Sequence, residues 1–210
     1  KAERPAIRNF QRGSDGHRPI DNDVLRSVIE GNRRLVLLTA HRRESFGAPI
    51  REVFAAVRTL AEEHDDIDIV YPVHPNPNVL GPAQELLSDH PRIHLTDPVG
   101  YFDLVAALDA ASLILTDSGG IQEEAPTFGT PVLVLREVTE RPEGVDAGVA
   151  ELVGTDGGRI LERARSILSR AQETLPATNP YGDGLAGKRI ADIVAADLLG
   201  RPRTTEDWGA

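Results

Sequence analysis

The chain has 210 residues and a formal net charge of −10. With 40% hydrophobic and 27% charged residues, the composition is that of a globular protein and not of a disordered chain. Aromatic residues make up only 4%, so the core must consist mainly of alanine, valine, leucine and isoleucine. The acidic surplus argues against nonspecific binding of nucleic acid, which needs a basic surface.

Residue types and patterns that are missing exclude further functions. The absence of cysteine excludes disulfides, thiolate zinc sites and a cysteine nucleophile. His17, His64, His90 and His94 do not have the spacing of metal ligands, so we expect no metal site. The sequence motifs of P-loop hydrolases, dinucleotide-binding proteins, zincins and serine hydrolases are missing. Without a signal-peptide pattern or an apolar run of about 20 residues, we expect a cytoplasmic protein with no membrane contact.

In chain order, a polar segment comes first and a regular pattern follows. Residues 1–23 contain proline and glycine and have no sustained apolar period, so we expect a loop or linker. Short apolar runs then predict six strands, at Leu35–Thr39, Ile67–Val73, Ile93–Thr96, Leu113–Thr116, Val132–Leu135 and Val149–Val153. Helical spacing is found at Pro49–His64, Val79–Leu87, Tyr101–Ala110, Ile121–Phe128, Ile160–Arg170 and Gly187–Leu199. Residues 200–210 are predicted to form a tail.

Strands that alternate with helices are typical of βαβ units. The sequence therefore predicts one α/β domain over residues 24–199, with a doubly wound parallel sheet of about six strands and helices on both faces. In such a sheet, ligands bind in the crevice beyond the carboxyl ends of the strands. The residues that directly follow each strand are therefore the candidates for a functional site.

The segment after the fourth predicted strand has the pattern of a phosphate-binding turn. Ser118, Gly119 and Gly120 precede a predicted helix, and the first backbone N–H groups and the dipole of a helix favour an anion. Glu124 lies one turn further, where its carboxylate can accept the two vicinal hydroxyls of a ribose. An ordinary serine-capped turn followed by a solvated face is the alternative. Pro126 is expected to shorten or kink this helix.

The segment after the first predicted strand brings His41, Arg42 and Arg43 to the same edge of the sheet. Arginine offers a planar fork of donors to a diphosphate, and histidine can transfer a proton near neutral pH. A salt-bridged turn, in which one of the arginines pairs with Glu44, is the alternative interpretation.

Two further segments that follow strands carry candidates. His74 lies among several prolines, so its backbone is stiff, although a lone histidine is more often structural. Arg141 follows the fifth predicted strand, in a charge-rich loop whose simplest interpretation is a solvated surface.

Taken together, five segments closely resemble the non-hydrolysing UDP-N-acetylglucosamine 2-epimerases. They match in order and in spacing, from about Arg34 to Leu199. The segments are T-A-H-R-R-E-S-F-G at Thr39–Gly47, V-Y-P-V-H-P-N-P-N at Val70–Asn78, L-T-D-S-G-G-I-Q-E-E-A-P at Leu115–Pro126, E-R-P-E at Glu140–Glu143 and N-P-Y-G-D-G at Asn179–Gly184.

The resemblance implies two Rossmann-like domains, as in GT-B glycosyltransferases, with the nucleotide sugar in the cleft between them. This chain would be the second of the two domains. Such isomerases interconvert UDP-N-acetylglucosamine (UDP-GlcNAc) and UDP-N-acetylmannosamine (UDP-ManNAc) for polysaccharide biosynthesis. They eliminate UDP and add it back with the opposite configuration at the second carbon of the sugar. The resemblance implies no metal or redox cofactor, and it suggests a homodimer for the full-length protein.

The resemblance also implies roles for single residues. His41 matches the active-site histidine of the family, near the diphosphate and the departing oxygen. The diphosphate-binding turn of the family is matched by Ser118, Gly119 and Gly120. Glu124 matches the glutamate that binds the ribose.

Further matches concern the phosphates, a regulatory site and the base. Arg141 matches an arginine near the phosphates. Arg42 and His74 match positions that contact a second, regulatory UDP-GlcNAc in bacterial members of the family. The uracil is held where this chain has Val99 and Leu104, whereas relatives can have a polar and an aromatic side chain there, so the resemblance implies recognition of the base by backbone groups.

The acid/base carboxylates of the family belong to the N-terminal domain, which we expect this chain to lack. The chain alone is therefore expected to bind the UDP part of the substrate weakly and not to epimerise the substrate. A non-catalytic nucleotide-sugar binding module is one alternative. The nucleotide-binding half of a GT-B glycosyltransferase is another, although H-R-R-E-S and E-R-P-E fit the epimerases better.

Overall fold

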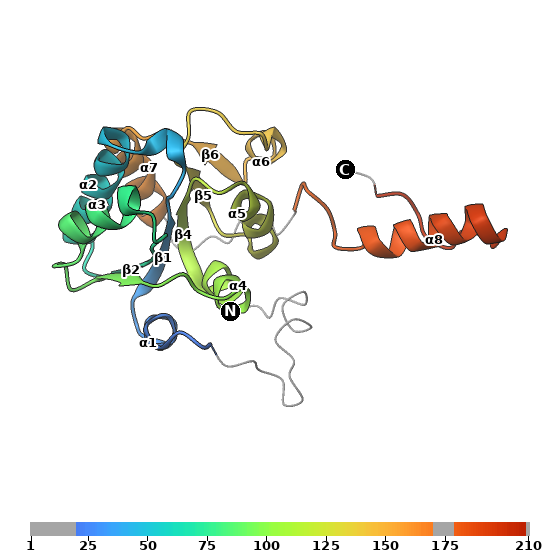
Figure 1. Ribbon diagram of the computed structural model, residues 1–210, viewed down its shortest axis with the longest axis horizontal. Helices are drawn as coiled ribbons and strands as arrows, with labels where there is room; N and C mark the ends of the chain where they lie inside the picture. The colour runs from blue at the N-terminus through green and yellow to red at the C-terminus, as the bar shows by residue number, and fades with distance from the viewer. Residues whose placement is uncertain (1–19, 170–178, 209–210) are drawn as a thin grey trace.

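A computed structural model describes residues 20–169 and 179–208, and its centre is a six-stranded sheet with the order β3-β2-β1-β4-β5-β6 (Figure 1). The strands are β1 (Arg34–Thr39), β2 (Ile67–Pro72), β3 (Ile93–Thr96), β4 (Ala111–Thr116), β5 (Val132–Val134) and β6 (Ala150–Leu152). Every neighbouring pair is parallel. The chain builds the sheet outward from β1 in one direction and then returns to place β4 on its other side, so the predicted doubly wound α/β fold is confirmed.

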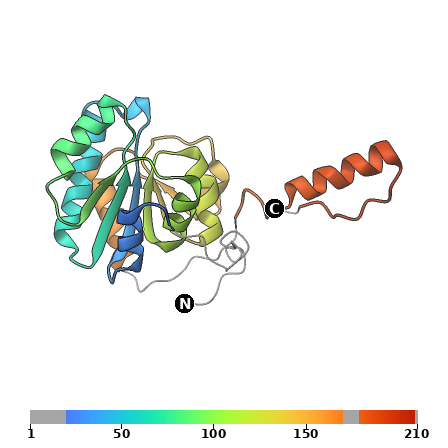
Figure 2. The ribbon, with the colours of Figure 1, turned by 60° about the horizontal axis from the view of Figure 1, so that its bottom comes forward.

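Helices cover both faces of the sheet, as Figures 1 and 2 show. The helices and 3-10 turns are α1 (Asp23–Glu30), η2 (Arg43–Ser45), α2 (Ala48–Glu63), α3 (Pro77–Leu87), α4 (Tyr101–Ala110), α5 (Gly119–Glu124), η3 (Ala125–Phe128), α6 (Pro142–Asp146), α7 (Gly157–Ser169) and α8 (Ala186–Leu199). One face is covered by α2, α3 and α7, and the other by α1, α4 and α5. The predicted helices are found within a few residues of their expected bounds.

Two hydrophobic cores lie on the two faces of the sheet, because successive side chains of a strand point in opposite directions. Val36 and Leu38 of β1 pack into the core under α2, α3 and α7. Leu35 and Leu37 of the same strand pack into the core under α1 and α4. Such two-sided burial explains why these strands are continuous apolar runs in the sequence.

The helix α1 was not among the predicted elements, since it is short and only Leu25 and Val28 are buried. Tertiary contacts hold it in place. The carboxylate of Asp103, in α4, accepts hydrogen bonds from the backbone N–H groups of Asp21 and Asn22 at 3.0 and 2.9 Å. The five-residue helix α6 was also not predicted, because it spans little more than one turn.

The expectation that Pro126 shortens its helix is confirmed. The segment predicted as one helix forms α5 up to Glu124 and then the 3-10 turn η3, which contains Pro126. It ends at Gly129, whose φ of 62° is the left-handed conformation that glycine adopts at helix ends.

The last helix, α8, stands apart from the sheet and its covering layers in both views (Figures 1 and 2). It has no buried residue. The following segment folds back on it, and the Asp192 carboxylate accepts hydrogen bonds from the backbone N–H groups of Thr204 and Thr205. Within the described residues, no helix is long and apolar enough to cross a membrane.

Parts of the predicted organisation lie outside the described residues. These parts are residues 1–19 of the expected linker, Arg170 of a predicted helix and the last two residues of the expected tail. The domain bounds at residues 24 and 199 stay a prediction.

Candidate functional site

The candidate residues gather where β1 and β4 end side by side. Thr39 and Thr116, the last residues of these strands, are in register, and their buried hydroxyls lie 2.6 Å apart. His41 follows β1 and Ser118 follows β4. The strands β1 and β4 are the neighbours at which the chain reverses the direction of sheet growth, and crevices at such points bind ligands in open α/β sheets.

Asp117 joins the two strand ends and is buried, with 1% of its surface exposed. Its Oδ2 accepts hydrogen bonds from the backbone N–H groups of His41 and Arg42, both at 2.7 Å. Its Oδ1 lies 3.5 Å from Nδ1 of the His41 ring. Sequence reasoning did not single out Asp117. The available signal was a carboxylate placed directly after a buried apolar strand, where a charge needs partners.

The rings of His41 and His74 stack, with their centroids 5.6 Å apart and their planes 10° from parallel. Nδ1 of His74 accepts a hydrogen bond from the backbone N–H of Asn76 at 3.1 Å, which fixes the orientation of this ring. The His41 side chain keeps 40% of its surface exposed. The structure thus brings together two histidines that lie on different strand ends.

The turn after β4 leaves a side chain and backbone N–H groups available at the start of α5. Ser118 occupies the N-cap position of α5, but its side chain makes no capping hydrogen bond. The backbone N–H of Ser118 donates to the Thr116 hydroxyl at 3.0 Å. The first N–H groups of a helix have no intrahelical acceptor, so those of Gly119 and Gly120 can serve a ligand.

Arg141 reaches this turn from the loop after β5. A Cβ at Gly119 would lie 3.0 Å from Cζ of Arg141, so the guanidinium occupies the space that a side chain would take. Arg141 Nε donates to the carboxylate of Glu123 at 2.7 Å. The Arg141 backbone N–H donates to the Thr139 hydroxyl, which donates to the Gln122 side chain of α5. The loop is therefore fastened to α5 at two points.

The N-P-Y-G-D-G segment makes hydrogen bonds to the same loop and to α5. The side-chain amide of Asn179 donates to the backbone carbonyl of Glu123 at 2.9 Å. The Tyr181 hydroxyl donates to the Arg141 carbonyl at 3.1 Å and accepts from the Gly144 N–H at 2.9 Å. Sequence reasoning recognised this segment as a motif but assigned no role to Asn179 or Tyr181.

A second arginine, Arg136, ties the loops after β1 and β5 together. Its guanidinium donates to both carboxylate oxygens of Glu140, at 2.7 and 2.9 Å, and its Nε lies 3.2 Å from Glu44. The pairing lowers the pKa of Glu140 to about 2. Among the described residues, neither Arg42 nor Arg43 pairs with Glu44, so the proposed alternative of a salt-bridged turn is wrong.

Glu124 is partly buried, and desolvation raises its pKa, with the neighbouring Glu123 as a second cause. Its Oε2 is buried and has no hydrogen-bond partner within the part of the chain that the structure describes. Near it, burial and the charge of Glu124 raise the pKa of Tyr101. A buried carboxylate oxygen without a donor is suited to accept hydrogen bonds from hydroxyl groups of a ligand.

The two residues expected near the uracil lie after β3. Val99 is in the loop before α4 and Leu104 is in the first turns of that helix, and both side chains are partly buried. Leu104 packs against the core under α1 and α4. The neighbouring Tyr101 and Phe102 are exposed, with 52% and 41% of their surfaces accessible.

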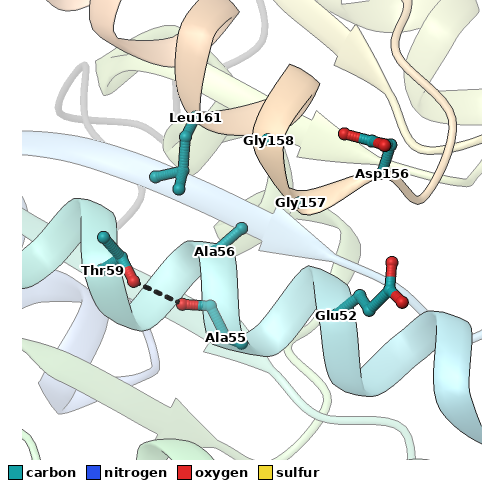
Figure 3. Close-up of a pocket in the computed structure, with 8 residues that line it drawn as sticks. All are labelled: Glu52, Ala55, Ala56, Thr59, Asp156, Gly157, Gly158 and Leu161. Atoms are coloured by element: carbon teal, nitrogen blue, oxygen red, sulfur yellow. Dashed lines mark hydrogen bonds between the residues drawn. The ribbon is translucent and has the colours of Figure 1, made fainter.

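A separate open groove lies between α2 and α7 (Figure 3). It is lined by Glu52, Ala55, Ala56, Thr59, Asp156, Gly157, Gly158 and Leu161. None of these residues is a candidate from the sequence, and the Thr59 hydroxyl is already bonded to the carbonyl of Ala55. Within residues 20–169 and 179–208, no group of three or more histidine, aspartate or glutamate side chains is placed to hold a metal ion.

Comparison with known proteins identifies a family to which the chain is similar. A family model described as UDP-N-acetylglucosamine 2-epimerase matches residues 10–195. A probable UDP-N-acetylglucosamine 2-epimerase of Ralstonia nicotianae is 51% identical over 169 residues, which cover 79% of this chain and 45% of that protein. The UDP-N-acetylglucosamine 2-epimerase of Escherichia coli K12 is 47% identical over 185 residues, which cover 83% and 49%.

Solved structures agree with the sequence matches. The structure of S. aureus MnaA with UDP has a TM-score of 0.84 and 38% identity, and the match covers 96% of this chain and 54% of that one. The chain spans about half the length of the relatives that it matches. With a family model over most of its length and a Rossmann-like sheet, the chain belongs to the UDP-N-acetylglucosamine 2-epimerase family.

Proposed function

We propose that this chain is the UDP-binding part of an epimerase that interconverts UDP-GlcNAc and UDP-ManNAc. The observation that carries the proposal is the meeting of His41 with the Ser118–Gly120 turn at the paired ends of β1 and β4. A similar structure holds UDP, and the similar epimerase of Neisseria meningitidis was solved with UDP-GlcNAc. Both proteins have 38% identity to this chain.

The diphosphate would lie over the turn after β4. There it would receive hydrogen bonds from the backbone N–H groups of Gly119 and Gly120 and from the Ser118 hydroxyl. The Arg141 guanidinium lies against Gly119, so it offers a charged donor at the same place. The free carboxylate oxygen of Glu124 would accept the ribose hydroxyls.

These groups suit the elimination of UDP. When the bond between the sugar and the diphosphate oxygen breaks, negative charge develops on the diphosphate. Donors that are already in place stabilise this charge with little reorganisation, and losing one of them lowers rates by roughly 10²–10³. His41 would donate a proton or a hydrogen bond to the departing oxygen. The N-terminal half of the full-length protein would supply the carboxylates that move the proton at the second carbon of the sugar.

UDP binding tests the proposal directly on this chain. We expect UDP to shift the backbone NMR signals of Ser118, Gly119, Gly120 and Glu124, because these groups would contact the diphosphate and the ribose. Titration with ADP is the control for a nonspecific diphosphate effect, and it should be weaker. If UDP at millimolar concentration leaves these signals unchanged, the proposed site is wrong.

Activity tests the second part of the proposal. We expect the purified chain to form no UDP-ManNAc from UDP-GlcNAc, because the expected acid/base carboxylates belong to the other half. In a complete enzyme that contains this domain, His41→Asn or Arg141→Ala should reduce turnover by roughly 10²–10³ while the fold is retained. Epimerisation by the chain alone, or near-normal turnover of either variant, would contradict the assignment.

A further inference from the structure

The buried carboxylate of Asp117 carries an inference about the proton on the imidazole of His41. We infer that Asp117 is a positioning residue, which holds His41 as the tautomer with its proton on Nδ1 and leaves Nε2 free for the ligand. The catalytic meaning of this inference rests on the proposed function, but the tautomer itself does not.

The two oxygens of the buried Asp117 carboxylate have different partners. Taking a carboxylate out of water is costly unless charges or donors compensate. Oδ2 is compensated by the N–H groups of His41 and Arg42. Oδ1 is also buried, yet no hydrogen bond to it is found within the described residues, and Nδ1 of His41 lies 3.5 Å from it.

An ionised carboxylate can only accept hydrogen bonds. The contact between Oδ1 and Nδ1 is therefore attractive only when Nδ1 carries the proton. In neutral histidine the other nitrogen, Nε2, is then an acceptor, and in the imidazolium both nitrogens are donors. The distance of 3.5 Å is longer than a hydrogen bond, and such contacts commonly tighten when a ligand binds.

His74 has the opposite arrangement, which provides an internal reference. Its Nδ1 accepts the backbone N–H of Asn76, so its proton must be on Nε2 when the ring is neutral. Because the rings of His41 and His74 stack at 10°, His41 is restrained from rotating away from Asp117. Two neighbouring rings thus hold opposite tautomers.

In the proposed reaction, this arrangement lets His41 give a proton to the diphosphate oxygen and take it back. In the imidazolium form of His41, Nε2–H would transfer its proton to the diphosphate oxygen as the bond to the sugar breaks. The neutral ring that remains has its proton on Nδ1, facing Asp117. When UDP adds back, the same proton returns to Nε2.

A purely structural role for Asp117 is the alternative, since the two bonds to backbone N–H groups alone would shape the turn. NMR of the chain labelled with ¹⁵N distinguishes the two roles, because long-range couplings show which ring nitrogen is protonated. At about pH 8.5, where an ordinary histidine is neutral, we expect Nδ1–H for His41 and Nε2–H for His74. Nε2–H on His41 would overturn the inference without any variant.

Asp117→Asn provides the second test. Its amide oxygen can still accept the backbone N–H groups, but its NH₂ group would face the ring and donate, so His41 should change to the Nε2–H tautomer while His74 stays unchanged. Asp103→Asn is the matched control, because Asp103 is also buried and accepts two backbone N–H groups, with no histidine among its described partners. An unchanged His41 tautomer in folded Asp117→Asn would assign Asp117 a structural role only.

UDP addition separates this inference from the proposed function. If the ring of His41 faces the diphosphate, UDP should shift the Nε2 signal of His41 in the original chain and less in Asp117→Asn. A missing UDP effect together with the Nδ1–H tautomer would refute the proposed function and leave the positioning role of Asp117 intact.

Discussion

At the residue scale, the position of Arg141 depends on the missing side chain of Gly119. The guanidinium lies where the Cβ of any other residue would come within 3.0 Å of Cζ. Glu123 and Glu140 hold it there from two sides, with the closest contact at 2.7 Å. An alanine at this position would crowd the guanidinium, which would have to give by a few tenths of an ångström, and it would also crowd an approaching ligand.

Gly119→Ala should displace Arg141 and weaken UDP binding about tenfold, since a hydrogen bond to a charged group contributes roughly 1.5 kcal/mol or more. Isothermal titration calorimetry of UDP binding measures the effect. Gly81→Ala is the matched control, because Gly81 also lies in a helix and has open space around its Cβ position. An unchanged UDP affinity in Gly119→Ala would contradict the prediction that UDP binding depends on the close approach of Arg141 to Gly119.

Tyr71 holds the backbone next to His41 through a hydrogen bond. Its ring is fully buried, and its hydroxyl donates to the backbone carbonyl of Ala40, directly before His41, at 2.5 Å. Burial raises the pKa of Tyr71, with the charge of Asp117 as a second cause, so the hydroxyl keeps its proton. The side chain from β2 therefore holds the end of β1 in place.

Tyr71→Phe should lower the free energy of unfolding by about 1–3 kcal/mol, because it leaves the carbonyl of Ala40 buried without a donor. Urea denaturation measures this change. Tyr101→Phe is the control, because Tyr101 is half exposed and its variant should differ by less than about 0.5 kcal/mol. Equal stability of the two variants would mean that water replaces the lost hydroxyl.

At the element scale, the loops after β1 and β5 are joined by charge. Arg136 is buried, and it reaches Glu44 of η2 and Glu140 before α6. The pair with Glu140 is bidentate, which fixes the loop geometry more strongly than a single contact. The loop that carries Arg141 is therefore held on one side by Arg136 and on the other by Thr139 and α5.

Acid should release this loop. The pKa of Glu140 is lowered from 4.5 to about 2, mainly by the hydrogen bond from Arg136. A lowered pKa means that the pair stabilises the folded loop above pH 4.5, and that this contribution is lost as the pH falls toward about 2. The NMR signals of Thr139 and Arg141 should shift over this range, and in Glu140→Gln they should not. A midpoint near 4.5 would show that the pair is not formed in solution.

At the scale of the whole molecule, one compact body holds both cores and the candidate site, and α8 lies apart from it (Figure 2). The apolar residues of α8 are exposed, with Ile190 at 62% and Leu198 at 76%. Within the described residues, the polar side chains of α8 contact segments that are adjacent in sequence, as in the pair between Arg189 and Asp183. The sheet domain therefore receives little stability from this helix.

A chain that ends at Leu185 should keep the stability of the sheet domain. We expect the free energy of unfolding to change by less than about 0.5 kcal/mol, because α8 has no buried residue. By contrast, Leu25→Ala in α1 should cost about 2–5 kcal/mol, since that side chain is 1% exposed. Thermal unfolding measures both. A large loss on removing α8 would reveal contacts with the sheet domain in solution.

The sequence by itself determined the six strands and most of the helices of this protein, and it predicted the edge of the sheet at which the candidate site lies. Apolar runs and helical spacing are local signals, and each records the burial of its own segment. The alternation of strands and helices then limits the topology to a doubly wound sheet, whose strand ends carry His41, Ser118 and Arg141. The family motifs lie on the same segments.

The partners of these residues were decided only by the tertiary structure. His41 and Asp117 are 76 residues apart in the chain, and they meet because β1 and β4 are neighbours in the sheet. No local pattern records such a meeting, nor that Glu44 would pair with Arg136 instead of its adjacent arginines. Hydrogen bonds and ion pairs depend on distances of a few ångströms, and these are set by the packing of strands that are distant in sequence.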